Sequence, residues 1–170
     1  MNRHIHTSRL GLIPLDLSQL GMLLNNVDAL EKSLGLAITR PLITDRVQRA
    51  IRMKIEKMKK ADPLQHAWFT YWLIVITEAG LGSGLIGFKG YPDDNGATEI
   101  GYGIDPAYQN KGYMTEAVLA LVGWALSHPF CKVVTATEVQ NHASRRLLEK
   151  IGARLVEEND GSSSWVIEQI

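Results

Sequence analysis

Residues 97–139 constrain the fold most strongly, because they combine a strand, a polar loop with one glycine, an apolar helix and another strand. The segments 97–104 and 132–139 lie between turn-forming residues and read as strands. A strand–helix–strand unit of this kind predicts a parallel strand pair joined by a right-handed crossover. The helix, at 113–127, has an unbroken apolar stripe of Met114, Ala117, Val118, Leu121, Val122 and Ala125. Because Leu119, Ala120 and Trp124 cover much of the rest, we expect it to be packed on both sides.

Further strands and helices on either side complete a mixed pattern. A turn sequence at 92–96 predicts a hairpin between strands at 84–91 and 97–104. An aromatic and β-branched run at 68–77 reads as a buried strand. The fold class is therefore α/β, in the α+β sense, and the length of 170 residues predicts one domain over 1–170. The other expected strands are 7–15, 153–158 and 163–170, and the other expected helices are 16–25, 28–34, 44–61 and 143–151.

Composition narrows the class of function. Lys plus Arg (18) equals Asp plus Glu (18), which argues against nucleic-acid or anionic-membrane partners. The first residues lack the pattern of a signal peptide, and the most apolar stretch is too short to span a bilayer. With the single cysteine, Cys131, these features predict a cytoplasmic protein. The five histidines show no metal-ligand spacing, so we expect no metal.

The loop and helix start at 104–115 form the segment most suited to binding chemistry. The first backbone N–H groups of a helix are unpaired and carry the positive end of its dipole. A loop folded around them makes an anion site suited to a pyrophosphate. Gly112 would let the backbone approach closely, and Lys111 would add positive charge. On these grounds alone, an ordinary loop-to-helix turn is the favoured interpretation.

Four sequence matches carry a resemblance to a known family. Gln109 and Gly112 fit the Gln/Arg-x-x-Gly-x-Gly/Ala motif of the GNAT acetyltransferases, with Met114 where glycine or alanine is commoner. The phrase KGYMTEA at 111–117 resembles the branch of ribosomal-protein N-terminal acetyltransferases. Residues 141–152, NHASRRLLEKIG, are similar to that branch's Asn-x-x-Ser…Glu-Lys-x-Gly helix, and TSRLGL at 7–12 is similar to its first strand.

The resemblance implies a fold and a cofactor. The fold would be a mixed central sheet of about six to seven strands, flanked by helices, with splayed central parallel strands. Acetyl-CoA would be the co-substrate, its pantetheine arm paired with backbone groups of Tyr102 and Ile104. Asn141 would hydrogen-bond the pantetheine or the substrate. The pyrophosphate would lie in the loop and helix start formed by Gln109, Asn110, Lys111, Gly112, Tyr113, Met114 and Thr115.

The implied reaction is direct transfer of an acetyl group to a primary amine, which must first lose a proton. Glu99 is the candidate base, because it shares a strand face with Gly101 and Gly103; a solvated carboxylate on a hairpin is the alternative. Ser144 is the candidate group that protonates or hydrogen-bonds the departing thiolate. Many members of the family carry a tyrosine where this chain has Leu148. Capping of the helix N-terminus is the alternative role for Ser144.

Several alternatives stay open. The chain could be a non-catalytic acyl-CoA sensor or regulatory module, or an unrelated protein that binds ATP or NAD. The acceptor could be a protein N-terminus or a small-molecule amine, and the chain could be a monomer or a homodimer. The basic helix at 44–61 could border the acceptor site, with Arg49 and Arg52 as test positions, or could be a solvated surface.

Overall fold

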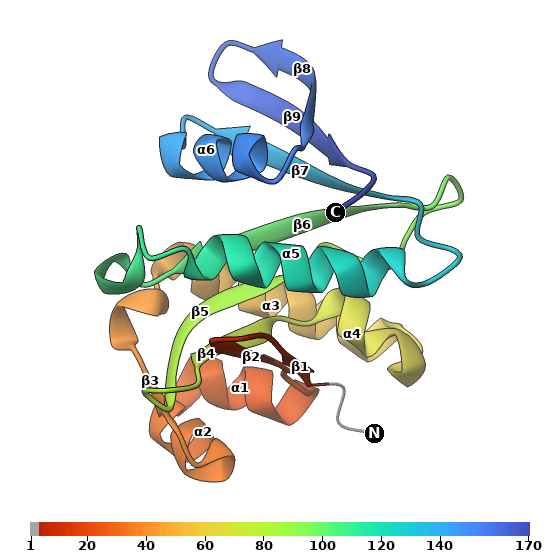
Figure 1. Ribbon diagram of the computed structural model, residues 1–170. Helices are drawn as coiled ribbons and strands as arrows, with labels where there is room; N and C mark the ends of the chain where they lie inside the picture. Colours follow the sequence, from red (N-terminus) through yellow and green to blue (C-terminus); the bar gives the residue numbers. More distant parts are fainter. Residues whose placement is uncertain (1–3) are drawn as a thin grey trace.

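The computed structural model describes residues 4–170 and centres on one mixed sheet, whose strand order is β1-β2-β4-β5-β6-β7-β9-β8 (Figure 1). Neighbouring strands are antiparallel except for two parallel pairs, β6 with β7 and β3 with β5. The strands are β1 Ile5–His6, β2 Leu10–Pro14, β3 Ala37–Ile38, β4 Trp72–Ile76, β5 Leu81–Phe88, β6 Ala97–Ile104, β7 Val133–Val139, β8 Arg154–Asn159 and β9 Ser162–Ile167. Across the described residues the sheet has nine strands, more than expected, because β1 and β3 are two-residue strands too short to leave a periodic pattern.

Polar side chains cap the N-termini of several helices. Asp16 forms a reciprocal capping box with Gln19 at the start of α1, and Thr44 caps α3. Asn141 caps α6. The helices are α1 Leu17–Asn25, α2 Val27–Leu34, α3 Asp45–Lys60, α4 His66–Phe69, α5 Tyr113–Leu126 and α6 His142–Lys150.

The strand expected at 68–77 begins four residues later than expected, at Trp72. The residues before it form a short 3-10 turn and then α4, which places Trp68 in a helix. Asp62 caps the turn and Pro63 occupies its first position, while the Trp72 indole donates to the Ala67 carbonyl at 3.0 Å. A short apolar run has no period that separates a strand from a buried helical turn, which explains the error.

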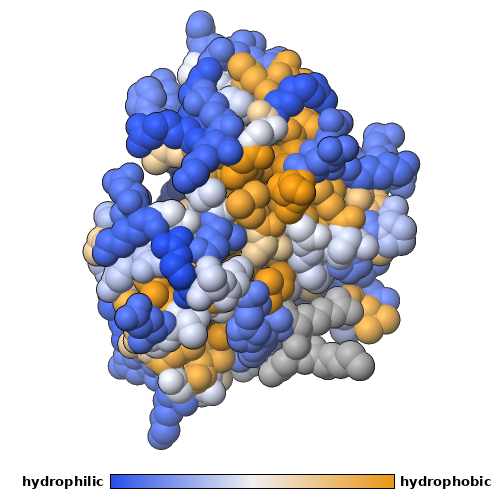
Figure 2. Space-filling model, in the orientation of Figure 1, coloured by the Kyte–Doolittle hydropathy of each residue, from blue (hydrophilic) through white to orange (hydrophobic). Residues whose placement is uncertain are grey.

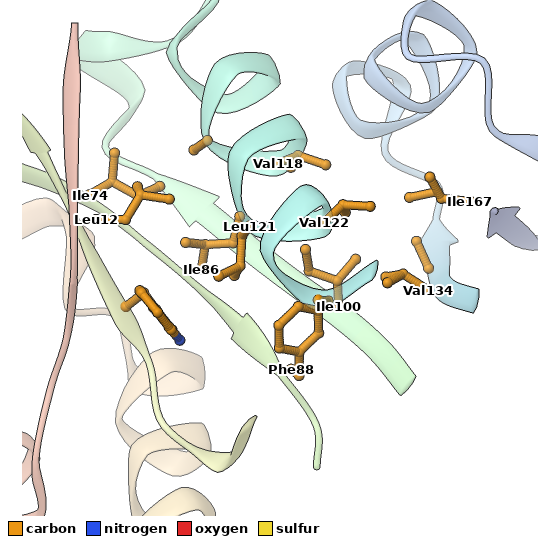
Figure 3. Close-up of a cluster of buried hydrophobic side chains, with 14 of the residues drawn as sticks. Leu12, Ile74, Ile86, Phe88, Ile100, Val118, Leu121, Val122, Val134 and Ile167 are labelled. Carbon is orange, nitrogen blue, oxygen red and sulfur yellow. The ribbon is translucent and has the colours of Figure 1, made fainter. Parts of the chain in front are cut away.

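Helices cover both faces of the sheet. On one face, α5 packs over β2, β5, β6 and β7, and its apolar stripe joins the core shown in Figure 3. On the other, α1, α2 and α3 pack around a second core that contains Leu20, Leu30 and Ile51. The buried residues of α5 form one stripe against the sheet, whereas Leu119 is exposed and Trp124 is only partly buried. The helix is therefore packed mainly on one side, and the expectation of packing on both sides was wrong. The Gly-x-Gly-x-x-Gly sequence at 82–87 lies inside β5, which is the wrong context for a dinucleotide loop.

The two central parallel strands separate along their length. β6 and β7 pair only from Ala97–Ile100 and from Val133–Ala136. Beyond that point β6 continues beside β5, and β7 continues beside β9. A wedge therefore opens between residues 101–104 and residues 137–139, and α6 follows β7 directly at its edge (Figure 1).

The face of the molecule shown in Figure 2 is mixed: polar residues (blue) cover much of it, and a band of apolar residues (orange) reaches the surface near α5 and the C-terminal strands. In the described part of the chain, none of the helices combines the length and apolar character needed to cross a bilayer.

Candidate active site

A cavity of about 360 Å³, here named the α5 cavity, lies at the start of α5. Its walls are the end of β6, the loop 108–112, the first turn of α5 and the facing side of α6. The surface is hollowed there, at the left of Figure 2, between two groups of polar residues. It is lined by every residue that the sequence assigned to cofactor binding except Lys111, and also by Gly103, Tyr108, Ala143, Ser144, Arg146, Leu147 and Lys150.

The loop that forms this cavity leaves the first N–H groups of α5 without a capping side chain. Gly112 occupies the N-cap position in the left-handed region, with φ of 79°. Asn110 is also left-handed, with φ of 59°. Upstream, the Asp105 side chain accepts from Ala107 N at 2.9 Å and fixes a 3-10 turn. The helix start therefore presents free donors and its positive dipole end to the cavity.

A clamp from the N-terminal region holds this loop in place. Glu116, in the first turn of α5, accepts from Arg9 Nε at 2.7 Å and from Arg9 N at 3.0 Å. Arg9 Nη1 donates to the Lys111 carbonyl at 2.9 Å, and the guanidinium stacks 4.7 Å from the centre of the Tyr113 ring. A Cβ at Gly112 would approach Arg9 Nη2 to 3.3 Å. Sequence reasoning assigned no site role to Arg9, because a contact spanning 107 residues leaves no local signal.

Cationic groups reach the α5 cavity from α6. Arg146 and Lys150 both line it, one helical turn apart, and none of the described residues lining it is acidic. Lys111 behaves differently, since its ammonium lies 5.3 Å from the centre of the Tyr108 ring and its side chain is not part of the wall. The i, i+4 spacing of Arg146 and Lys150 is the sequence signal that places both cations on one face of α6.

A second cavity, here named the α3 cavity, lies on the opposite side of the wedge and measures about 520 Å³. Its walls come from the start of α3, the ends of β5 and β6, and residues 136–139 of β7. Gly101 and Gly103 face it with nothing within 4 Å of an added Cβ. Open space therefore lies beside Glu99 on this face of β6.

Two carboxylates line the α3 cavity. Glu99, the candidate base, forms an ion pair with Lys89, and about a quarter of its side chain (27%) is exposed. Glu138 on β7 is buried and accepts from the backbone N–H of Asn141. Sequence reasoning missed Glu138, because nothing in its neighbourhood distinguishes it from the other glutamates of the chain.

The two cavities meet at the open end of the wedge. Tyr102 Oη and Ser144 Oγ are hydrogen-bonded at 2.8 Å. Asn141 Oδ1 accepts from Ser144 N at 3.0 Å, so Asn141 rather than Ser144 caps α6. Leu148 is fully buried in the core. The residues that line both cavities are Tyr102, Gly103, Ile104, Asn141 and Ser144.

The basic helix borders the α3 cavity only through its first turns. Arg46, Val47 and Ala50 line the cavity, whereas Arg49 and Arg52 do not. Lys54 points inward, and its ammonium donates to the carbonyls of Phe69 at 3.2 Å and Phe88 at 2.7 Å. Burial, and then the nearby Lys57 and Lys89, lower the pKa of Lys54 to about 7.

Among the described residues, no group of three or more His, Cys, Asp or Glu side chains comes together. Cys131 is buried, and burial raises the pKa of its thiol.

Comparisons with known proteins point to one family. Residues 9–154 match the family model described as acetyltransferase (GNAT) domain. A protein of Bacillus subtilis (strain 168) named "uncharacterized N-acetyltransferase YjdG" is 36% identical over 99 residues, which are 58% of this chain and 59% of that protein. The match thus spans less than two thirds of the relative's length.

Solved structures share the fold. A GNAT-family acetyltransferase from Bacillus anthracis superposes with a TM-score of 0.63 at 20% identity, covering 97% of this chain and 98% of that one. A RimL ribosomal L7/L12 α-N-protein acetyltransferase in complex with coenzyme A has a TM-score of 0.66 at 18% identity, covering 98% of both chains. A ribosomal-protein-S5-alanine acetyltransferase from Vibrio fischeri has a TM-score of 0.67 at 16% identity, covering 97% of this chain and 96% of that one. With the family model matched over most of the chain, the protein belongs to the GNAT acetyltransferase family.

Proposed function

We propose that the protein is an N-acetyltransferase that moves an acetyl group directly from acetyl-CoA to a primary amine. The observation that carries this proposal is the meeting of two chemically different cavities at the wedge between β6 and β7. A thioester held from one side and an amine entering from the other would come together where Tyr102 and Ser144 lie. We further propose that residues 1–170 act as one acyl-CoA N-acyltransferase domain and work in the cytoplasm.

The α5 cavity fits the phosphates and arm of CoA. Its donors are the free N–H groups at the start of α5 and the cations of Arg146 and Lys150. The backbone of β6 at residues 102–104 lies beside β5 on one side and opens into both cavities on the other, because β7 has diverged. An extended pantetheine arm would pair with that free edge, as an added strand would. Because Asn141 Oδ1 already caps α6, its NH2 group is the part left to donate to a ligand.

The α3 cavity supplies the groups that the reaction needs on the amine side. Glu99 would accept the proton that the amine must lose, directly or through water. The Lys89 ion pair would have to loosen or share Glu99 when the substrate enters. Ser144 would donate a hydrogen bond or a proton to the leaving thiolate, a role left open to it because it does not cap α6.

The acceptor would be a protein N-terminus or a small-molecule amine that also carries an anionic group. Arg46 lines the α3 cavity and has no ion-pair partner among the described residues, so it is available for such a group. RimL is named as a ribosomal L7/L12 α-N-protein acetyltransferase, and the Vibrio fischeri protein as a ribosomal-protein-S5-alanine acetyltransferase, which supports a protein or peptide acceptor.

The test is release of the CoA thiol from acetyl-CoA against a panel of peptide and small-molecule amines, with mass spectrometry of the acetylated product. Turnover with at least one amine supports the proposal. Binding of CoA without thiol release for any amine would instead identify a sensor or regulatory module. Stabilisation by ATP or NAD, but not by CoA, would contradict acyl-CoA binding altogether.

A further inference from the structure

The Tyr102 side chain is placed at the point where the two cavities meet. It lies on the α5-facing side of β6, together with Ile100, and packs against the core of that side. Its hydroxyl reaches past the core to Ser144 on α6, at 2.8 Å. The contact joins residues 42 apart and bridges the wedge between β6 and the helix that follows β7.

The Ser144 hydroxyl has little else to hold it. The α6 cap is made by Asn141, so the Ser144 side chain is not engaged in capping. Among residues 4–170, the hydrogen-bond partner of Ser144 Oγ is Tyr102 Oη. Further along α6, Leu147 and Leu148 are packed into the core and offer no donor. The orientation of the serine proton therefore depends on the tyrosine.

A phenol is a stronger acid than an alcohol and is the better donor in a tyrosine–serine pair. Burial raises the pKa of Tyr102, the Ser144 hydrogen bond opposes this, and the negative charge of Glu138 adds to the rise. Tyr102 therefore keeps its proton across the physiological range. A chain of hydrogen bonds also polarises its members, which makes the terminal proton a better donor.

We propose that Tyr102 is a positioning residue and proton source for Ser144, so that the two hydroxyls form a relay to the departing thiolate. In this relay Tyr102 donates to Ser144 Oγ, which leaves the serine proton free to face the sulfur. This inference rests on the proposed acetyl transfer.

The bonds and protons of the step balance. The amine nitrogen forms a bond to the acyl carbon, and the bond between that carbon and sulfur breaks. The amine proton passes to the base on the α3 side. The sulfur takes the Ser144 proton, Ser144 takes the Tyr102 proton, and Tyr102 recovers one through solvent from the base.

The experiment compares Tyr102→Phe, Ser144→Ala and the double variant in steady-state kinetics with the full-length chain. Phenylalanine keeps the ring in the core, so the fold is retained, and the melting temperature checks this. Each single variant is expected to lower kcat about tenfold, with the KM for acetyl-CoA within about twofold. Because the two hydroxyls act as one unit, the double variant should lose no more than about the larger single effect.

The matched control is Tyr91→Phe, which removes a hydroxyl near the opposite end of β6, where Tyr91 stacks on Phe130 with ring centroids 5.0 Å apart. It should leave kcat unchanged. A Tyr102→Phe enzyme with normal kcat, or a double variant whose loss is the product of the single losses, would overturn the relay while leaving acetyl transfer intact. Failure of the unmodified protein to acetylate any amine would overturn both the proposed function and the relay.

Discussion

The two cavities on either side of the β6–β7 wedge are built in opposite ways. The α5 cavity is formed by a continuous run of chain, 102–115, closed by one helix, and its charged lining is basic. The α3 cavity collects residues from at least four separate parts of the chain, including the start of α3, Tyr71, Lys89 and the end of β7, and it mixes acids with bases. A ligand bound by backbone donors needs a local motif, whereas a ligand bound by side chains needs only that the fold brings them together.

The largest expected effect separates chemistry from cofactor binding. Glu99→Gln should lower turnover at least about tenfold, because the amine loses its proton acceptor in the α3 cavity. The affinity for acetyl-CoA should hardly change, since Glu99 does not line the α5 cavity. Steady-state kinetics across a pH series, together with CoA titration, measures both quantities.

A suitable control for this variant is Glu157→Gln, which makes the same change on the exposed strand β8. It should leave turnover unaltered. If Glu99→Gln also turned over normally at every pH, Glu99 would not be the base, and Glu138 would become the carboxylate to test.

The second prediction concerns the clamp behind the phosphate loop. Arg9→Met breaks the contacts to Glu116 and Lys111 O, so the loop would lose its support and the Kd for CoA should rise about fivefold, or about 1 kcal/mol. Arg40→Met is the matched control, because Arg40 also bonds a glutamate and a backbone carbonyl, at Glu31 and Ile38. If calorimetric titration showed the same loss of CoA affinity for both variants, the effect would come from general destabilisation and not from loss of the clamp.

The third prediction tests the acceptor side. Arg46→Met should raise the KM for an acidic acceptor about threefold and weaken its dependence on salt, because one cation at the cavity is removed. Arg49→Met removes a cation of the same helix outside the cavity and should have no such effect. Equal responses from the two variants would assign the effect to the general charge of α3.

The last prediction concerns stability, at the wall behind the α3 cavity. Lys54 has a pKa of about 7 in the folded chain and about 10.4 when unfolded. Between these values the unfolded chain binds a proton that the folded chain lacks, so stability rises with pH over that window. The difference in melting temperature, unmodified protein minus Lys54→Met, should therefore increase between pH 7 and pH 10. A constant difference would show that Lys54 titrates normally.

The contrast between the cavities also explains how far sequence reasoning reached. The strand–helix–strand unit, the hairpin before it and the basis of the α5 cavity follow from local periodicity and one glycine. Arg9 and Glu138 could not be found this way, since their roles arise from contacts with distant residues or from burial. The Tyr102 side chain escaped notice for the same reason, because its partner lies 42 residues along the chain.

Local sequence patterns also failed to predict two details of the fold. The apolar run at 68–77 contains both α4 and β4, and only the Asp62 cap and the tertiary contact of Trp72 separate them. The strands β1 and β3 are held by two register pairs each, which is too little sequence to produce a pattern.

The most direct test of the two-cavity account is calorimetric titration of CoA into the unmodified protein, the Arg146→Glu/Lys150→Glu variant and Glu99→Gln. The account predicts that CoA binds the unmodified protein and Glu99→Gln with similar affinity. Reversing both charges in the α5 cavity should weaken binding at least about tenfold, because each would repel a phosphate. Equal affinity in all three proteins, or a loss confined to Glu99→Gln, would contradict the assignment of the α5 cavity to CoA.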